Sequence, residues 1–273
     1  MPDLGSDGTI RLAAFAAAFA FMALIEAVRP RRKPHPLRLR RWLTNVTIGG
    51  LGAALLRVMA ALALPLAALA AAALAEQRGW GVLARLDWPW WIELFIAVIV
   101  LDFAIWLQHW LSHRIPLLWR LHRVHHADVD FDVTTALRFH PFEIGLSMLY
   151  KIVWVLALGP SVPAVLVFEV MLNVCAVFNH ANARLPVALD RALRLVLVTP
   201  DMHRVHHSVE RGEHNTNFGF NLAFWDRLFG TYTAEPAAGH EGMTIGLAPY
   251  QSDRPSELGW SLALPMRRER KTH

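Results

Sequence analysis

The sequence is poor in the side chains that build disulfide-bonded or thiolate-ligated sites. It holds one cysteine in 273 residues, Cys175, and this residue lies in an apolar run. A single thiol excludes disulfides within the chain, iron–sulfur clusters and thiolate zinc sites. Any bound metal must therefore be held by nitrogen and oxygen atoms.

Two other patterns are missing. Soluble di-iron bundles bind iron through Glu residues and Glu-x-x-His motifs, and no such motif occurs here. The Lys and Arg residues do not form a stripe with readout residues, because they flank apolar segments instead. The net charge of +5 therefore indicates membrane topology, and we expect no nucleic acid partner.

Apolar residues dominate the composition. The hydrophobic fraction is 55% and the mean hydropathy is +0.32, above the usual values for globular domains. Four long apolar segments occur, at about 10–28, 46–75, 90–107 and 144–178. The second should kink at Pro65, and the fourth should form a helical hairpin because "GPSVP" interrupts it. We predict an all-α integral membrane protein with about 4–5 apolar spans.

The basic residues predict the orientation of the spans. Residues 29–41 read "RPRRKPHPLRLRR", with seven Lys or Arg and three prolines, so we expect an exposed, non-helical and cytoplasmic loop. The "WPWW" at 88–91 resembles an aromatic belt at the opposite interface. An even number of crossings separates the basic loop from His109. The histidine-rich region is therefore predicted to be a metal-binding helical cap on the cytoplasmic face.

Eight of the 14 histidines fall in three clusters with helical spacing. They are His109 and His113; His122, His125 and His126; and His203, His206 and His207. Residues three or four apart lie on one face of a helix, and imidazole is the commonest protein metal ligand. Without a metal, packing eight ionisable rings together would cost desolvation and mutual repulsion. We interpret the clusters as a metal centre, although imidazole suits Fe, Zn, Cu and Ni alike.

The order of these motifs resembles the fatty acid hydroxylase and sterol desaturase superfamily of integral-membrane di-iron enzymes. The matching segments are "LWRLHRVHH", "TTALRFHPFE", "TPDMHRVHH" and "WDRLFGTY". The resemblance covers about residues 96–232, whereas the N-terminal third matches only in being apolar. It implies two iron ions that activate O2 for attack on an unactivated C–H bond.

The resemblance also implies a ligand set. It comprises His109, His113, His122, His125, His126, His180, His203, His206 and His207. Some members carry a further histidine one turn before His180, where this chain has Ala176. His140 and His214 lie within family motifs but outside its ligand positions, so we expect them to support the ligands or face substrate.

Metal-bound histidines usually donate their second N–H to a carboxylate or carbonyl. Five acidic residues are near enough in sequence to accept such a bond: Asp102, Asp128, Asp132, Asp201 and Glu143. Three further histidines, His35, His240 and His273, are expected to be solvated.

The expected function is that of a membrane-bound oxidoreductase that uses O2 to hydroxylate or desaturate a lipid: a fatty acyl, sterol-like or other lipid. A carotenoid hydroxylase or ketolase is the alternative, and a metal transporter or a haem protein is a more distant one. The sequence shows no cytochrome, flavin or ferredoxin pattern, so we expect a separate electron donor, ferredoxin- or cytochrome-type with its reductase. The predicted divisions are an N-terminal membrane region (1–88), a catalytic domain (89–232) and a C-terminal cytoplasmic tail (233–273).

Overall fold

The computed structural model describes residues 4–62 and 67–268, and the regular elements of this part of the chain are all helices. Three isolated β-bridges accompany them, and the described residues form no strand. The predicted all-α fold is confirmed.

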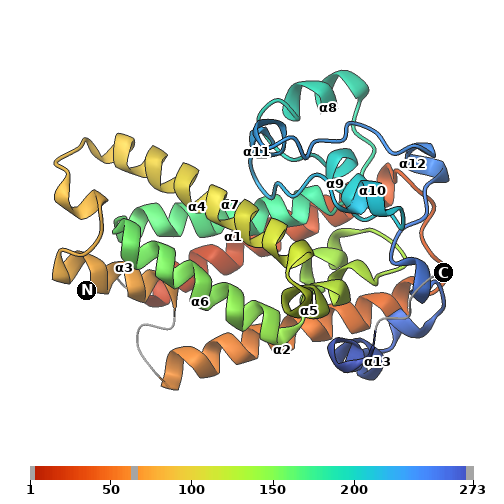
Figure 1. Cartoon of the computed structure of the whole chain (residues 1–273), viewed down its shortest axis with the longest axis horizontal. Helices are drawn as coiled ribbons and strands as arrows, with labels where there is room; N and C mark the ends of the chain where they lie inside the picture. The colour runs from red at the N-terminus through yellow and green to blue at the C-terminus, as the bar shows by residue number, and fades with distance from the viewer. Residues whose placement is uncertain (1–3, 63–66, 269–273) are drawn as a thin grey trace.

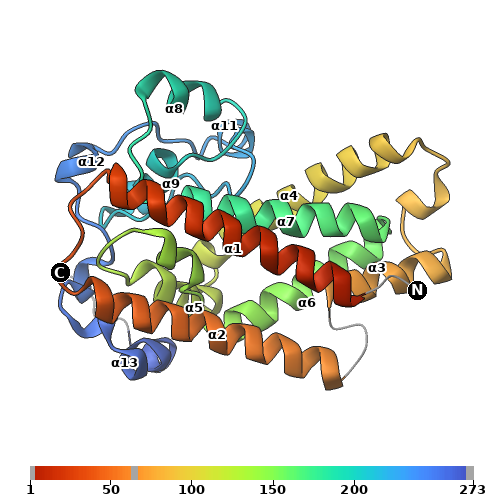
Figure 2. The ribbon, with the colours of Figure 1, turned by 180° about the vertical axis from the view of Figure 1, so that it is seen from behind.

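Five helices are long and apolar enough to cross a membrane. They are α1 (Leu4–Val28), α2 (Arg38–Leu62), α4 (Trp90–Arg114), α6 (Pro141–Leu158) and α7 (Val162–Asn179). At about 1.5 Å per residue, each of them is about 27 Å or longer, which matches the hydrocarbon thickness of a bilayer. They run along the long axis of the molecule, with α1 packed on α7 and α2 packed on α6 (Figures 1 and 2). This number agrees with the predicted 4–5 spans.

The second apolar segment differs from the prediction. The structure divides it between α2 and the short helix α3 (Ala68–Arg78), while the predicted kink at Pro65 lies outside the described residues. Helix α3 packs on α6 and α7, at the end of the molecule away from the C-terminus (Figure 1). The turn that follows α3 fits tightly there, since a Cβ on Gly81 would lie 2.3 Å from the backbone nitrogen of Gly159.

The predicted helical hairpin is confirmed as α6 and α7. Gly159 ends α6 in the left-handed conformation with a φ of 67°, and Pro163 lies in the first turn of α7. Glu93 of α4 holds the turn, because its Oε1 accepts a 2.6 Å hydrogen bond from the backbone N–H of Ser161. The hairpin returns the chain to its starting end and so delivers His180 beside the other histidines.

Short helices and loops form a cap on the end of the spans that is near the C-terminus in Figure 1. We define this helical cap as residues 115–140 and 180–268. Its helical segments are α5 (Pro116–His126), η2 (Val133–Leu137), α8 (Val187–Leu193), α9 (Pro200–His206), α10 (Arg211–His214), α11 (Phe224–Leu228), α12 (Gly239–Gly242), η3 (Ala248–Tyr250), η4 (Arg254–Ser256), α13 (Leu258–Ala263) and η5 (Leu264–Met266). One further turn, η1 (Leu83–Arg85), precedes α4 at the opposite end.

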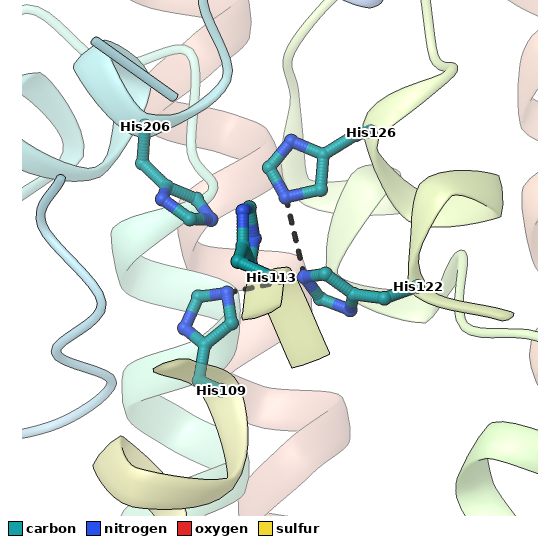
Figure 3. A group of neighbouring side chains, drawn as sticks. All are labelled: His109, His113, His122, His126 and His206. Carbon is teal, nitrogen blue, oxygen red and sulfur yellow. Dashed lines mark hydrogen bonds between the residues drawn. The ribbon is translucent and has the colours of Figure 1, made fainter. Parts of the chain in front are cut away.

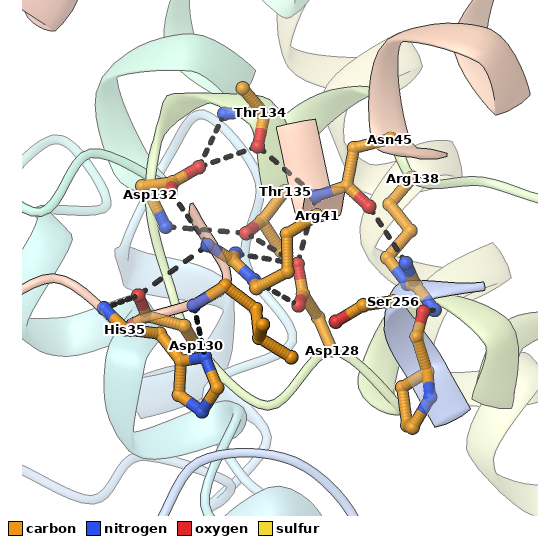
Figure 4. Close-up of polar contacts among 12 residues, drawn as sticks. His35, Arg41, Asn45, Asp128, Asp130, Asp132, Thr134, Thr135, Arg138 and Ser256 are labelled. Atoms are coloured by element: carbon orange, nitrogen blue, oxygen red, sulfur yellow. Dashed lines mark hydrogen bonds and ion pairs between the residues drawn. The ribbon is translucent and has the colours of Figure 1, made fainter. Parts of the chain in front are cut away.

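A buried ion network joins the cap to α2 (Figure 4). Arg41 is fully buried and binds Asp128 through two hydrogen bonds of 2.6 and 2.8 Å, and Asp132 through a third of 2.9 Å. The prediction that residues 29–41 form an exposed, non-helical loop is therefore wrong at its C-terminal end, where α2 begins at Arg38. Carboxylates of the cap compensate the desolvated guanidinium, which is why burial is tolerated.

A second buried arginine ties the C-terminal segment of the cap to α5 and α2. Arg138 donates to the carbonyls of Val124 and Pro255 and to the Asn45 side chain, each at 2.7–2.8 Å. Arg123 donates to the carbonyl of Leu264 at 2.6 Å. The histidine-bearing α5 is thus held between α2 and the last helices of the chain.

Candidate metal centre

The structure brings all nine predicted ligand histidines together at the junction of the spans and the cap. They form two groups, and within each group the ligand atoms lie within 4.8 Å of one another. The five-histidine group comprises His109, His113, His122, His126 and His206 (Figure 3). The four-histidine group comprises His125, His180, His203 and His207.

Helix geometry explains how each HxxHH motif serves both groups. In α5, His122 and His126 are four residues apart and face the five-histidine group, whereas His125 faces the other group. In α9 the division is reversed. His206 faces the five-histidine group, whereas His203 and His207 face the four-histidine group. The extended residue Ile115 separates α4 from α5 and turns the chain back, so the two helices present their histidines to one another.

The spacing of the ring nitrogens fits a metal ion. In the five-histidine group the Nε2 atom of His122 lies 3.1 Å from that of His109 and 3.2 Å from that of His126. In the four-histidine group the His180 Nε2 lies 3.1 Å from those of His125 and His203. Two nitrogens bound to one ion at about 2.0–2.1 Å are themselves about 3 Å apart. Hydrogen bonds between the rings would satisfy only some of these nitrogen–nitrogen contacts, because a neutral imidazole carries a single N–H.

Burial keeps five of the cap imidazoles neutral. Desolvation, followed by repulsion from neighbouring rings, holds the pKa well below its usual value in five of them: His125, His126, His203, His206 and His207. A neutral ring offers a lone pair, which is the form that binds metal. Among the described residues, the His206 Nε2 and both nitrogens of His207 are buried without a hydrogen-bond partner, and a bound ion would satisfy such atoms.

Hydrogen bonds from the outer nitrogens orient the rings. His122 donates its Nδ1–H to Glu143 Oε1 at 2.6 Å. Three other Nδ1 atoms contact main-chain carbonyls: His109 contacts Phe218 at 2.8 Å, His180 contacts Ala176 at 2.7 Å, and His206 contacts Thr216 at 2.7 Å. A proton held on Nδ1 leaves the Nε2 lone pair directed into the group.

Of the five predicted carboxylate acceptors, Glu143 alone binds a ligand histidine among the described residues. The other four have different partners: Asp102 accepts from the Trp225 indole, Asp128 and Asp132 bind Arg41, and Asp201 binds Arg204. These four candidates contact no ligand histidine, because an arginine or an indole engages each carboxylate instead. Arg41 and Trp225 are distant from their partners in sequence, whereas Arg204 is three residues from Asp201.

Sequence reasoning missed Asp226. Its Oδ1 accepts from the backbone N–H of Phe218 at 2.8 Å and from the Trp106 indole at 3.1 Å. It thereby fixes the loop whose Phe218 carbonyl accepts from His109. The signal was available, since Asp226 belongs to the "WDRLFGTY" segment that carries the family resemblance.

His140 and His214 lie outside both groups. The His140 ring caps α6 by accepting from the backbone N–H of Phe142, and its Nε2 lies 3.3 Å from the Leu262 carbonyl. The structure therefore places it neither against a ligand histidine nor in the cavity described below. The His214 ring stacks on Trp119, with centroids 5.8 Å apart, and lies 6.1 Å from the His113 ring.

The prediction of three solvated histidines is wrong for His240. This residue is 4% exposed, and its Nε2 lies 2.8 Å from a Glu235 carboxylate oxygen. Burial lowers its pKa to about 4 in spite of the nearby Asp201. His35 is half-buried, with its Nδ1 accepting from the backbone of Leu37, and His273 lies outside the described residues.

A cavity of about 230 Å³ runs from the five-histidine group into the spans. His109, His122 and Glu143 line its cap end. Its walls are mostly apolar: Leu56, Ile105, Phe139, Met148, Leu172 and Phe220. A second, polar cavity reaches the same group from the other side, at His113 and His214. The five-histidine group thus separates an apolar cavity from a polar one.

Comparison with known proteins agrees with this geometry. The family model described as fatty acid hydroxylase matches residues 94–231, which include all nine histidines. The chain belongs to the fatty acid hydroxylase family. No solved structure matches it.

Curated relatives include three lipid-modifying enzymes. The ornithine lipid hydroxylase OlsE of Rhizobium tropici is 29% identical over 150 residues, which cover 55% of this chain and 44% of the relative. Alkylglycerol monooxygenase of Homo sapiens is 34% identical over 151 residues, covering 55% and 32%. Cholesterol 25-hydroxylase of Rattus norvegicus is 25% identical over 145 residues, covering 53% and 48%. Each match spans less than half of the relative's length.

Proposed function

We propose that this protein is a membrane-bound di-iron oxygenase that hydroxylates a lipid with O2. The observation that carries the proposal is the convergence of nine histidines into two adjacent groups, of which the five-histidine group lines one end of an apolar cavity. The names of the relatives support hydroxylation over desaturation, because those cited are hydroxylases or a monooxygenase of lipids. The carotenoid hydroxylase or ketolase remains the alternative.

The five-histidine and four-histidine groups would each hold one iron ion, which when bound supplies O2 activation for attack on a C–H bond. The protein's own contribution is orientation and shielding. Glu143 keeps the His122 proton on Nδ1 and so directs Nε2 inward. The apolar walls of the cavity would hold a lipid chain beside His109 and His122 and exclude water from it.

We further propose that residues 89–232 form the catalytic domain, between an N-terminal membrane region (1–88) and a C-terminal tail (233–273). The family match at 94–231 lies within the proposed catalytic range. We also propose a separate electron donor, a ferredoxin- or cytochrome-type protein with its reductase.

The metal centre is proposed to face the cytoplasm. The basic loop and the cap lie at the same end of the spans, since Arg41 at the start of α2 binds Asp128 of the cap. The positive-inside rule assigns that end to the cytoplasm. Single cysteines at Lys33 and Arg211 in a Cys175→Ser background should both be labelled from the cytoplasmic side. Labelling of either one from the opposite side alone would contradict the topology.

The direct test of function combines metal analysis with turnover. Protein expressed with sufficient iron should contain two transition-metal ions per chain by plasma mass spectrometry. Supplied with a reductase, an electron donor, ¹⁸O2 and membrane lipids, it should transfer one labelled oxygen atom to a lipid. Zero or one ion per chain, or no labelled lipid from protein carrying two irons, would overturn the proposal.

A further inference from the structure

Three ionisable side chains meet inside the spans, away from the histidines. Arg11 of α1 lies 2.9 Å from one oxygen of Glu169 in α7, and Lys151 of α6 lies 2.7 Å from the other. The side chains of Glu169 and Lys151 are 2% and 10% exposed, whereas that of Arg11 is 32% exposed. We refer to these three residues as the ion triad. Ionisable groups within spans are costly and commonly belong to functional sites.

The ion triad and the metal centre share one cavity. All three residues line the apolar cavity that His109 and His122 line at its cap end. Lys151 follows Glu143 by eight residues on α6, so the two positions are about 12 Å apart along the helix axis. A molecule in the cavity would therefore contact the metal centre with one end and the ion triad with the other.

The charges of the ion triad do not balance. Two cations face one carboxylate, and each carboxylate oxygen lies within ion-pair distance of one cation, although Glu169 Oε2 makes no hydrogen bond among the described residues. The Lys151 ammonium has three N–H donors, of which Glu169 uses one. The Arg11 Nε is buried without a hydrogen-bond partner among the described residues. The site thus offers spare donors and one uncompensated positive charge.

We propose that the ion triad binds the anionic oxygen group, a carboxylate or a phosphate, of a single-chain lipid. One negative charge would neutralise the ion triad, and its oxygens would accept from the spare donors of Lys151 and Arg11. The hydrocarbon chain would extend along Ile105, Met148 and Leu172 toward His109. The cavity volume of about 230 Å³ favours one chain over two. The inference rests on the proposed function only in assigning the metal centre to the histidine end of the cavity.

A binding experiment tests the inference without turnover. Purified protein in a neutral detergent is titrated with hexadecanoate, with hexadecyl phosphate and with methyl hexadecanoate, which has the same chain but no charge. We expect at least one anion to bind about tenfold or more tightly than the ester. Whether the carboxylate or the phosphate binds more tightly identifies the anion. Equal binding of all three probes by the unaltered protein would overturn the proposal.

Variants assign the preference to the ion triad. Lys151→Met leaves Arg11 and Glu169 as a neutral pair and should remove the preference for the anion while keeping ester binding. Lys151→Arg should retain the preference, and so should the control Lys33→Met, which alters an exposed lysine of the basic loop. If the ion triad only joined helices, Lys151→Met would lower Tm and leave the ratio of anion to ester binding unchanged, which would also overturn the proposal.

This result is separable from that of the proposed function. Loss of metal binding or of oxygen transfer would refute the oxygenase proposal while the anion preference persisted. An unaltered enzyme that hydroxylates a lipid but binds anion and ester equally would refute the ion triad proposal alone.

Discussion

Replacing Arg41 by methionine removes the cation at the centre of the network that joins α2 to the cap (Figure 4). The substitution keeps an unbranched chain of similar length and leaves Asp128, Asp130 and Asp132 without their shared partner. These carboxylates lie in the loop that directly follows His125 and His126 of α5. We therefore expect a loss of stability together with a loss of metal.

The expected magnitude follows from two independent arguments. Interaction with Arg41 lowers the pKa of Asp128 from 3.8 to about 2 in spite of its burial. That difference corresponds to about 2 kcal/mol of stability, which is present above pH 3.8 and lost as the pH falls through 2. Removing the cation itself costs more, about 3–5 kcal/mol, because several buried carboxylates are left uncompensated.

The two estimates predict an order among variants. Asp128→Asn should cost about 2 kcal/mol, because Arg41 keeps Asp132 at 2.9 Å. Arg41→Met should cost about 3–5 kcal/mol and lower the Tm in detergent on the order of 10 °C. The matched control is Arg40→Met, in which an arginine with a half-exposed side chain loses its surface contact with Glu257, at a cost of less than about 1 kcal/mol.

The variants are compared by monitoring thermal unfolding through intrinsic fluorescence. The metal content is measured on the same samples. The double variant Arg41→Met with Asp128→Asn should be less destabilised than the sum of the two single variants. Equal Tm values for Arg41→Met and Arg40→Met would refute the assignment of the network as the link between α2 and the cap.

Three further predictions concern the histidines. Replacing His125 by alanine should reduce the metal content from two ions per chain to one or none, whereas His273→Ala should leave it unchanged, as plasma mass spectrometry would show. Glu143→Gln removes the negative charge beside His122 and should weaken metal binding about 10–100-fold in a chelator competition, and unchanged affinity would contradict its role. Burial lowers the pKa of His180 from 6.5 to about 4 and holds the pKa well below 6.5 in the five cap imidazoles named above, so the unfolded chain binds more protons below pH 6.5. Metal-free protein should therefore keep its full Tm above pH 6.5 and lose it progressively toward pH 4, and a flat Tm profile would refute this account.

The spans and the shared helix faces of the clustered histidines were predictable because their signals are local. Unbroken apolar segments of 18 residues or more fix the long helices, and histidines three or four apart fix a shared helix face. His180 was predicted from the family resemblance, since a single histidine at the end of an apolar segment has no periodic signal of its own. The "GPSVP" turn predicted the hairpin that brings it back to the cap.

Partners of the buried charges were not predictable, because they depend on contacts between distant segments. Arg41 and Asp128 are 87 residues apart, and Arg31 and Asp201 are 170 apart. A proline-rich basic segment is typical of an exposed loop, and only the packed carboxylates of the cap make the burial of Arg41 favourable. The burial of His240 has the same origin, since it depends on acidic groups from other elements.

The division of ligands between the two groups shows why a third histidine recurs in each HxxHH motif. In each helix two rings four residues apart serve one group and the remaining ring serves the other, so neither helix can shift without disturbing both groups. Helices α4 and α7 complete the groups unequally, with two rings and one ring. The family resemblance places a further histidine of some members at Ala176, one turn before His180, and this small alanine side chain lines the apolar cavity. An imidazole at that position would project into the cavity, so the small alanine side chain leaves room there for the lipid chain of the proposed reaction.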